Sequence, residues 1–411
     1  MFPIEQPSAR LNEDITIQAG NGTKIVANLN GLIKAMITPD GNIVPLHMDY
    51  AQYDSQRGKD NNSGAYLFIP TGPAEKFSPE PYPVLVVTEG IYKTTLYSDL
   101  TSPKAADILL AVTLYNNPSI PQTEVEITNT FLIDPQVDNL ELAMRFSTEI
   151  KNGDVFFTDL NGMHMIKRRY MDKLPLQANF YPMPAATYIE DGKTRLTLLT
   201  STPLGVAALQ PGQIEVMQDR RLNKDDSRGL AQGVLDNVRT RHTFKLIVEK
   251  AMNPCLTRTA PEHPSGELSL GAHVAQQLLL QPLVGMHYTA RDDSPRSGYA
   301  RAAPQGADLV LAGYHSHVSA KTKDGTLLHG MGMTFHRVYL DQCYGDKELK
   351  NWYHVGDGQV QVSELVDAPS DRVYESTLTF VQLKERLPDG IVTLCPQEIR
   401  SVFINQTLKD Y

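Results

Sequence analysis

Apolar and polar residues alternate along much of this chain, and the clearest case is the segment 141–150. Every second side chain there is apolar or a threonine, while the positions between them include Glu141, Arg145 and Glu149. A period of two places alternate side chains on opposite faces, so this segment is predicted to be a strand with one buried face. Similar but shorter segments predict further strands at 83–88, 124–132, 195–200, 213–217, 243–250, 309–314 and 376–383.

Turn-forming residues separate many of these segments, and only one segment has a helical pattern. Gly and Asp tolerate positive φ, and Pro presets φ near about −65°. The helical pattern covers 265–281, where Ala272, Val274 and 278–280 form an apolar stripe that ends before Pro282. Turns are expected at 39–41, 191–192, 211–212, 324–325 and 388–390.

The order of these elements favours one fold class. Many strands with almost no helices between them are typical of packed antiparallel sheets and not of a βαβ fold. We therefore expect an all-β chain with one short helix near 265–281. A chain of 411 residues is long enough for two or three domains. A Pro- and Arg-rich stretch at 292–304 has the character of a linker or long surface loop, so we divide the chain near residue 290, into 1–290 and 291–411.

Composition and charge narrow the class of protein. The hydrophobic fraction of 41% and the charged fraction of 21% are those of a globular protein with sizeable cores. The chain has 38 Lys+Arg against 47 Asp+Glu, a net charge of −9, which makes nucleic acid an unsuitable partner. No apolar run approaches the ~18 residues that a membrane helix needs, and the first ten residues lack a signal-peptide pattern. Taken literally, these features predict a soluble cytosolic protein.

The cysteines and the glycosylation sequons add little by themselves. Cys255, Cys343 and Cys395 have the spacing of neither a zinc finger nor a redox pair. Their odd number leaves at least one thiol unpaired within the chain, and composition alone predicts three buried, small apolar side chains. Asn-x-Ser/Thr sequons begin at Asn21, Asn61 and Asn405, and they matter only if the chain enters a secretory lumen.

Short motifs give weak support for a metal site and none for several enzyme classes. His47-x-Asp49 and His315-x-His317 each offer two ligands, whereas zinc sites need three or four, so a surface or packing role is expected for both. The chain has no GxSxG elbow, no GxGxxG before a helix and no Walker loop. A serine hydrolase, a dinucleotide-binding enzyme and a P-loop enzyme therefore have no support.

Two segments carry an unusual density of polar side chains. The segment 217–237 holds Asp225, Asp226 and Arg228 among other charges, with two glycines. It is either a solvated hairpin end or a loop that presents hydrogen-bonding groups to a polar ligand. The segment 157–182 mixes charged and aromatic residues. It either frames a sugar or nucleotide or forms a charged edge strand with a packed turn.

Longer motifs in and around these segments carry a resemblance to a known family. They read SGAYLF, FFTDLNG, IKRR, DKLPLQAN, RLTLLT, GQIEVMQDRRL and DDSRGLAQGVLDN, with MTFHRVYL, TLTFVQL and VTLCPQE further on. These motifs closely resemble the C-terminal part of class II α-mannosidases, glycoside hydrolase family 38, and within it the Golgi α-mannosidase II type. The likeness is dense from Ser63 to Lys250 and thinner toward the end of the chain.

The resemblance implies a fold and an incomplete enzyme. It implies a galactose-mutarotase-like antiparallel supersandwich followed by a smaller β-sandwich. In the family the nucleophilic aspartate, the acid/base aspartate and the zinc ligands lie in an N-terminal domain that this chain lacks, so no catalytic residue and no metal ligand is assigned here. The family's zinc motif, His-x-Asp-Pro-Gly-Trp, is not matched by the sequence His47-Met48-Asp49-Tyr50. We therefore expect zinc only in the intact enzyme.

The resemblance also implies a site, partners and a location. Tyr66 of SGAYLF and Arg228 of DDSRGL match residues at the rim of the family's active site, and we expect Asp226, together with Asp225, to hold Arg228 by charge-assisted bonds. The implied function is retaining hydrolysis of α-linked mannose from N-glycans in the Golgi lumen.

The partners expected from the resemblance are the mannose-bearing N-glycan and the missing catalytic domain, with a second copy of the chain as a further candidate. Cys395 is a candidate to pair with the missing part, and an apolar patch that packs on that part would make the isolated chain poorly soluble. The alternatives are a non-catalytic carbohydrate-binding or scaffold protein derived from the family and an unrelated β-sandwich binding protein.

Overall fold

The computed structural model describes residues 13–55, 62–80, 83–102, 105–252, 265–282, 284–285, 306–345, 347–366 and 370–406. It confirms an all-β chain of antiparallel sheets. The chain divides into two compact units, which are described separately. Unit 1 comprises 1–266, 275–281 and 343–346, and unit 2 comprises 267–274, 282–342 and 347–411. The boundary predicted near residue 290 and the linker at 292–304 lie outside the described residues and stay predictions.

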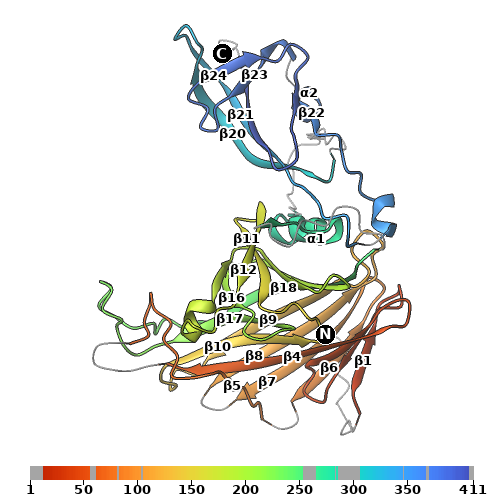
Figure 1. Ribbon diagram of the computed structural model, residues 1–411, viewed down its shortest axis with the longest axis vertical. Helices are drawn as coiled ribbons and strands as arrows, with labels where there is room; N and C mark the ends of the chain where they lie inside the picture. The colour runs from red at the N-terminus through yellow and green to blue at the C-terminus, as the bar shows by residue number, and fades with distance from the viewer. Residues whose placement is uncertain are drawn as a thin grey trace, which may run out of the picture. The chain divides into compact units, whose positions relative to one another are not determined.

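Unit 1 contains two large sheets (Figure 1). The nine-stranded sheet has the order β1 (Ile15–Gln18), β2 (Lys24–Ala27), β3 (Ile33–Ile37), β4 (Ile43–Asp54), β10 (Leu140–Thr148), β17 (Gln213–Arg221), β16 (Leu204–Ala207) and β13 (Tyr181–Met183), with β5 (Glu75–Lys76) pairing to β4. The ten-stranded sheet has the order β19 (Ser265–Gly266), β12 (His164–Arg169), β11 (Val155–Leu160), β14 (Ala186–Glu190), β15 (Thr194–Thr200), β18 (Thr240–Lys250), β9 (Val125–Ile133), β8 (Ala106–Tyr115), β7 (Lys93–Ser102) and β6 (Val84–Glu89).

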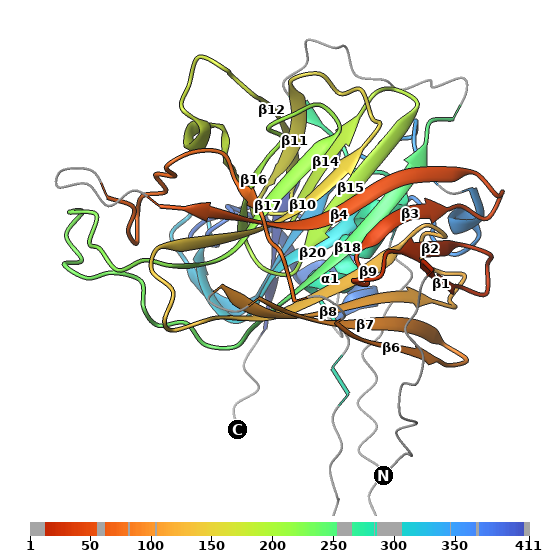
Figure 2. The same cartoon turned by 90° about the horizontal axis from the view of Figure 1, so that it is seen from below.

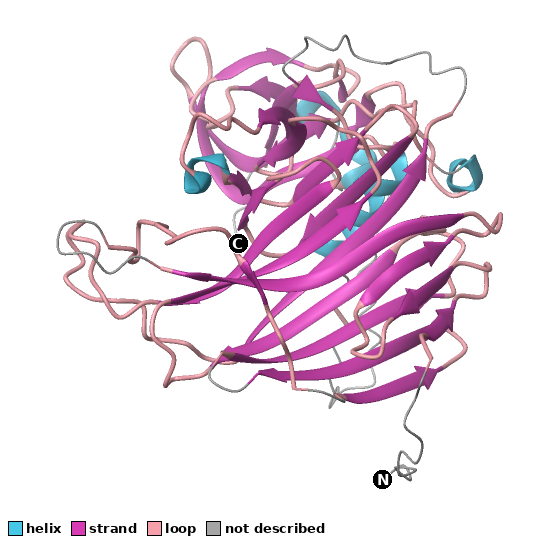
Figure 3. Cartoon of the chain, turned by 60° about the horizontal axis from the view of Figure 1, so that its bottom comes forward, coloured by secondary structure: helices cyan, strands magenta, loops and turns pink. Residues whose placement is uncertain are grey.

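One hydrophobic core lies between these two sheets, whose long strands are seen in Figure 3. Met144 and Phe146 of β10 belong to the same buried cluster as Ile127 and Phe131 of β9, and all four are fully buried. Removing apolar surface from water stabilises a fold by roughly 25 cal/mol per Å², so a core shared by both sheets holds them together. The prediction of a sandwich of antiparallel sheets is therefore confirmed.

The strand at 141–150 is confirmed as β10, but the prediction that it has only one buried face is wrong. Ala143 is fully buried and Glu141 is only 1% exposed. The reason is position: β10 pairs with β4 on one side and β17 on the other. A strand in the middle of a wide sheet is covered more completely than its own alternation indicates, and the carboxylate of Glu141 is accommodated by an ion pair with Arg220 at 2.6 Å.

The strand predicted at 376–383 is also wrong, whereas the other predicted strands are present. The chain forms β23 (Val373–Ser376) and β24 (Leu383–Arg386), which pair with each other across a turn. Phe380 has φ 58°, and the amide of Gln382 donates to the side-chain oxygen of Thr377 at 3.3 Å. Five predicted turns are confirmed by glycines of positive φ: Gly41, Gly192, Gly212, Gly325 and Gly390.

The predicted helix is α1 (Leu270–Leu280), which is shorter than expected. Its start follows Ser269, whose hydroxyl oxygen accepts a hydrogen bond from the amide of Ala272 at 3.0 Å, as an N-cap residue does. None of the helices among the described residues is long and apolar enough to cross a membrane.

Unit 2 is built on a smaller sheet. Its five-stranded sheet has the order β20 (Leu309–Lys321), β21 (Leu327–Arg337), β26 (Ile399–Asn405), β23 and β24, and a separate pair joins β22 (Gln359–Gln361) to β25 (Ile391–Thr393). A single-turn helix, α2 (Val362–Leu365), follows β22. Three 3₁₀ turns complete the described helices: η1 (Leu176–Asn179) in unit 1, and η2 (Lys347–Asn351) and η3 (Ser370–Arg372) in unit 2.

The prediction that the three cysteines are buried is confirmed for Cys343, which is 3% exposed, and is wrong for Cys395, which is exposed. Cys343 is disulfide-bonded, and Cys395 is a free thiol on the surface. Cys255 lies outside the described residues. Pairing of Cys395 with an upstream part of a longer protein stays a prediction.

Strand β6 exposes apolar side chains at the end of the ten-stranded sheet. Val84 is 59% exposed and Val86 is 47% exposed. Ile91 and Tyr92, which follow the strand, are exposed to a larger fraction than either valine. β6 has a neighbour on one side only, namely β7. The predicted apolar patch that would pack on an upstream domain was not assigned to a segment, and it stays a prediction.

Candidate active-site rim

Two loops that are far apart in the sequence leave the nine-stranded sheet of unit 1 at the same edge. β4 and β17 flank β10, and the last residue of each, Asp54 and Arg221, pairs with Leu140. Because both strands are antiparallel to β10, they run in the same direction and their following loops emerge together. Figure 2 shows these loops side by side, one orange-red and one green. The first contains Tyr66 and the second contains Arg228.

The loop that contains Tyr66 is a compact turn. The amide of Gly64 donates to the carbonyl oxygen of Leu67 at 3.1 Å, and the hydroxyl of Ser63 bonds to both backbone polar groups of Ile69. Phe68 packs edge-on against Tyr53 and Phe180, with ring centroids 5.2 and 5.4 Å apart. The aromatic contacts anchor this turn, while the side chain of Tyr66 remains 62% exposed. Its phenol is therefore free to donate a hydrogen bond to a ligand.

The loop that contains Arg228 has a fixed base and an open tip. Leu222 and Val234 exchange both backbone hydrogen bonds, at 2.9 and 2.8 Å, and close the loop at its base. Within the loop, Ser227 has φ 58° and Gly229 has φ 102°, so the backbone reverses around Arg228. Arg228 is exposed, and its guanidinium donates to the carbonyl oxygen of Ser227 at 3.5 Å. Most of the tip is solvated, as the first alternative predicts. That the loop presents hydrogen-bonding groups to a polar ligand stays a prediction.

Asp226 lies behind the rim and not on it. Its side chain is 5% exposed, and one carboxylate oxygen accepts hydrogen bonds from the amides of Tyr66 at 2.7 Å and Leu67 at 2.9 Å. Burial alone would raise the pKa of Asp226, but the backbone donors of Tyr66, Leu67 and Arg228 lower it below its ordinary value. The carboxylate is therefore ionised at neutral pH.

The expected ion pairs of Arg228 are not present. Among the described residues no salt bridge joins Arg228 to Asp225 or Asp226. The physical reason is that Asp226 already accepts backbone donors from the neighbouring loop. Backbone amides are fixed in place, whereas a long exposed guanidinium loses side-chain entropy when it is held.

Three other residues at this edge were not identified from the sequence. The guanidinium of Arg220 donates to the carbonyl oxygen of Leu67 at 2.7 Å, and the side-chain amide of Asn62 donates to the carbonyl oxygen of Asp225 at 3.2 Å. At Gly64 a Cβ atom would lie 2.7 Å from the side chain of Asp226. Gly64 stands inside the motif SGAYLF and Arg220 inside GQIEVMQDRRL, and these motifs were their signals in the sequence.

The segment 157–182 is part of the scaffold. Asp159 of β11 is 1% exposed and accepts hydrogen bonds from the amides of Ala185 and Ala186 at 2.8 Å. The guanidinium of Arg168 lies 5.1 Å from the centre of the Tyr181 ring. These contacts fit a charged strand with a packed turn better than a frame for a ligand.

The short histidine motifs lie apart from the rim loops in the sequence, and their contacts are those of surface and packing residues. Asp49 forms an ion pair with Lys76 at 2.8 Å, while the ring of His315 packs on Phe380 at 5.3 Å; His47 and His317 are exposed. Within the described ranges, no group of three or more His, Cys, Asp or Glu side chains is arranged to hold a metal ion. The residues present therefore do not fit a zinc site.

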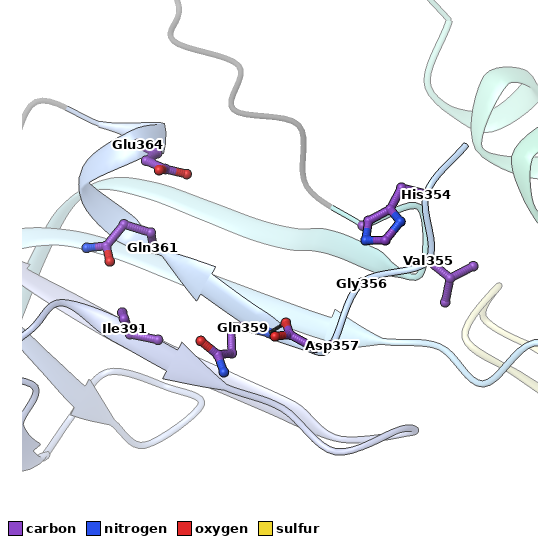
Figure 4. A pocket seen from close by; sticks show the side chains of 9 residues that line it. His354, Val355, Gly356, Asp357, Gln359, Gln361, Glu364 and Ile391 are labelled. Carbon is purple, nitrogen blue, oxygen red and sulfur yellow. Dashed lines mark hydrogen bonds between the residues drawn. The ribbon is translucent and has the colours of Figure 1, made fainter. Parts of the chain in front are cut away.

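A polar groove lies in unit 2. It has a volume of about 580 Å³, and its lining includes the side chains of His354, Asp357, Gln359 and Glu364 (Figure 4). All four side chains are exposed to solvent. The groove therefore gives no built set of buried polar partners for a ligand.

The comparisons with known proteins define the class of this chain. The family model described as "Glycosyl hydrolases family 38 C-terminal domain" matches residues 21–228, which is more than half of the chain and lies within unit 1. The chain therefore belongs to this family. The matched residues end at Arg228 and include Tyr66 and Asp226.

The relatives are α-mannosidases. The chain is 38% identical over 393 residues to "Alpha-mannosidase 2" of Drosophila melanogaster, a match that covers 94% of this chain and 33% of that protein. It is 39% identical over 259 residues to "Alpha-mannosidase 2" of Homo sapiens, covering 62% of this chain and 22% of that protein. The chain thus spans about a third of the length of the fly relative.

A solved structure has the same fold. The alpha-mannosidase from Enterococcus faecalis V583 superposes with a TM-score of 0.59 at 13% identity, covering 98% of this chain and 42% of that one. At this identity the likeness shows the fold alone.

Proposed function

We propose that this chain is the C-terminal portion of an α-mannosidase that removes α-linked mannose from N-glycans by retaining hydrolysis. The observation that carries the proposal is the family match, which ends at the loop that presents Arg228 and includes the loop that presents Tyr66. The names of the relatives at 38% and 39% identity support the same activity.

In this proposal the chain contributes binding groups and not the reacting carboxylates. In a retaining glycosidase one carboxylate forms a covalent glycosyl-enzyme and a second acts as acid and then as base. We assign both, and the zinc ligands, to an upstream domain, because the matching family model describes a C-terminal domain and the match covers only 33% of the fly relative. No step of the reaction is assigned to a metal held by this chain.

Tyr66 and Arg228 have the exposure and the chemistry that the rim requires. The phenol of Tyr66 is a single donor suited to a sugar hydroxyl or to a catalytic carboxylate. The guanidinium of Arg228 offers several donors of fixed geometry to hydroxyl and carboxylate oxygens. Both side chains are exposed and lie in loops that follow neighbouring strands of β10, where an upstream catalytic domain and its substrate would contact them.

A secretory location, the Golgi lumen, belongs to the same proposal. The disulfide at Cys343 supports it, because disulfides persist in oxidising compartments and are rare in the cytosol. This replaces the literal prediction of a cytosolic protein.

An α-mannosidase assay on two forms of the protein tests the proposed function. The 411-residue chain alone is expected to be inactive, and the chain joined to its upstream region is expected to release mannose. Activity of the isolated chain would show that its own residues include the catalytic carboxylates. A folded but inactive longer protein would favour the carbohydrate-binding or scaffold alternative.

A further inference from the structure

We propose that Asp226 is a positioning residue of the rim, whose carboxylate joins the Tyr66 loop to the Arg228 loop so that both side chains are presented as one preassembled pair. This inference rests on the proposed function, in which Tyr66 and Arg228 contact the substrate. It assigns to Asp226 a role that acts through the backbone of the opposite loop.

The first support is the geometry of the carboxylate. A single oxygen of Asp226 accepts from two successive amides, those of Tyr66 and Leu67, at 2.7 and 2.9 Å. Hydrogen bonds to an ionised acceptor are shorter and about twice as strong as neutral ones. The side chain is 95% buried, since its exposed fraction is 5%, so water competes little for these bonds. The backbone at Tyr66 is thus fixed while its side chain stays free.

The second support is the close fit between the loops. An atom added at Gly64 would lie 2.7 Å from the Cβ, the Cγ and the amide nitrogen of Asp226. Only a residue without Cβ permits this approach, so Gly64 brings the Tyr66 loop within hydrogen-bond distance of the carboxylate.

The third support is that the contact continues on either side of Asp226. The side-chain amide of Asn62 donates to the carbonyl oxygen of Asp225 at 3.2 Å. Arg220 donates to the carbonyl oxygen of Leu67 at 2.7 Å and is itself held by Glu141 at 2.6 Å. After Asp226 the left-handed backbone of Ser227, φ 58°, turns the chain between the buried carboxylate and the exposed Arg228. Movement of the backbone in the Tyr66 loop is therefore coupled to movement of the backbone in the Arg228 loop.

The direct test is amide hydrogen exchange on the 411-residue chain. Asp226→Ala is expected to lower the protection of the Tyr66 and Leu67 amides by about tenfold or more, because two bonds to a charged acceptor are lost. Asp226→Asn keeps one acceptor oxygen and is expected to restore part of the protection. Asp236→Ala, an exposed carboxylate in the same loop, is the matched control and should leave these amides unchanged. Unchanged protection in Asp226→Ala would overturn the proposal.

Kinetics of the chain joined to its upstream region separate positioning from a general loss of structure. Asp226→Ala is expected to lower kcat/KM by about tenfold or more, and to have a much smaller effect when Tyr66→Phe is already present, because both changes remove the same interaction. Fully additive effects would overturn the positioning role. If Tyr66→Phe and Arg228→Ala both retain full activity while Asp226→Ala still loses protection, the proposed function fails and the link between the loops stands.

Discussion

The two units of this protein are stabilised in different ways. In unit 1 two wide sheets enclose one extensive core to which both sheets contribute fully buried side chains, among them Phe131 and Phe146. In unit 2 the core beneath the five-stranded sheet is small, and most of β20 is exposed. Unit 2 also contains a buried ion pair, between Arg337 and Asp308 at 2.8 Å. The family model and the rim loops both fall in unit 1.

The difference supports the proposal that the loops of Tyr66 and Arg228 in unit 1 form an active-site rim. A binding group must be held to within a fraction of an ångström, and loops that leave the centre of a wide, well-packed sheet have the most rigid support. The loops that contain Tyr66 and Arg228 follow β4 and β17, the two strands that flank β10 in the sheet. Unit 2 has no equivalent platform among its described strands.

The largest effect is expected from the core of unit 1. Phe146→Ala removes a fully buried ring from the cluster that both sheets share, and is expected to lower the free energy of unfolding by about 3–5 kcal/mol. Urea unfolding followed by tyrosine fluorescence and circular dichroism measures this change. Val86→Ala, at an exposed site of β6, is the control and should change stability by less than about 0.5 kcal/mol. A similar loss in both variants would contradict a core located between the sheets.

The buried ion pair between Arg337 and Asp308, called here the polar staple of unit 2, is expected to contribute slightly less to the free energy of unfolding. Arg337→Met leaves the carboxylate of Asp308, whose side chain is 2% exposed, without its 2.8 Å partner. The guanidinium also donates to three carbonyl oxygens, those of Gly356, Asp357 and Leu394. We expect a loss of about 3 kcal/mol, seen as faster proteolysis and hydrogen exchange in unit 2 alone.

Arg400→Met is the matched control for the staple, because Arg400 is more exposed and pairs with Glu398 at 2.7 Å near the surface. Its expected cost is below about 1 kcal/mol. If Arg337→Met instead loosened unit 1, the two units would not be independent and the contrast between them would be wrong.

Acid is expected to weaken unit 2 through His273. Burial is the main reason that the pKa of His273 is lowered from 6.5 to about 4, and the charge of His336 also lowers it. Two groups act in the opposite direction: the carbonyl oxygen of Ala307, to which Nε2 donates at 3.0 Å, and the carboxylate of Asp308. Between pH 6.5 and about pH 4, His273 binds a proton in the unfolded chain but not in the folded chain. The stability is therefore fully present above pH 6.5 and falls as the pH drops toward 4. At pH 5 the expected loss is about 2 kcal/mol.

The measurement is the urea midpoint at pH 7 and pH 5 for the natural chain and for His273→Gln, which keeps a donor for Ala307 and does not titrate. The variant should lose most of this pH dependence. His47→Gln, at an exposed position, should retain it. An equal pH dependence in the natural chain and His273→Gln would exclude His273 as the cause.

The smallest effect on stability is expected at the rim itself. Tyr66→Phe removes a hydroxyl from a side chain that is 62% exposed, so the free energy of unfolding should change by less than about 0.5 kcal/mol. In the chain joined to its upstream region, kcat/KM should fall by about tenfold, because a donor to a polar ligand is lost. A large loss of stability would make Tyr66 structural and remove it from the rim.

The sequence predicted the elements well where pattern alone decides them. Period two identified β10, and Gly-containing turns such as that at Gly212 were identified because positive φ restricts the residue type. The pattern failed at 376–383, where apolar residues continue through a turn, and at Glu141, where alternation predicted solvent. At 376–383 a turn between two short strands interrupts the pattern, and at Glu141 the neighbouring strand β17 supplies the partner Arg220.

The candidate rim divides in the same way. Tyr66 and Arg228 were identified because they stand in recognisable motifs, and the sequence alone determined the all-β class and the family. Only the tertiary structure showed that Asp226 is buried and bonded to the amide of Tyr66, 160 residues away. The physical reason is that motif and alternation are local properties of the chain, whereas the strand order β4-β10-β17 sets which loops meet and which polar groups find partners there.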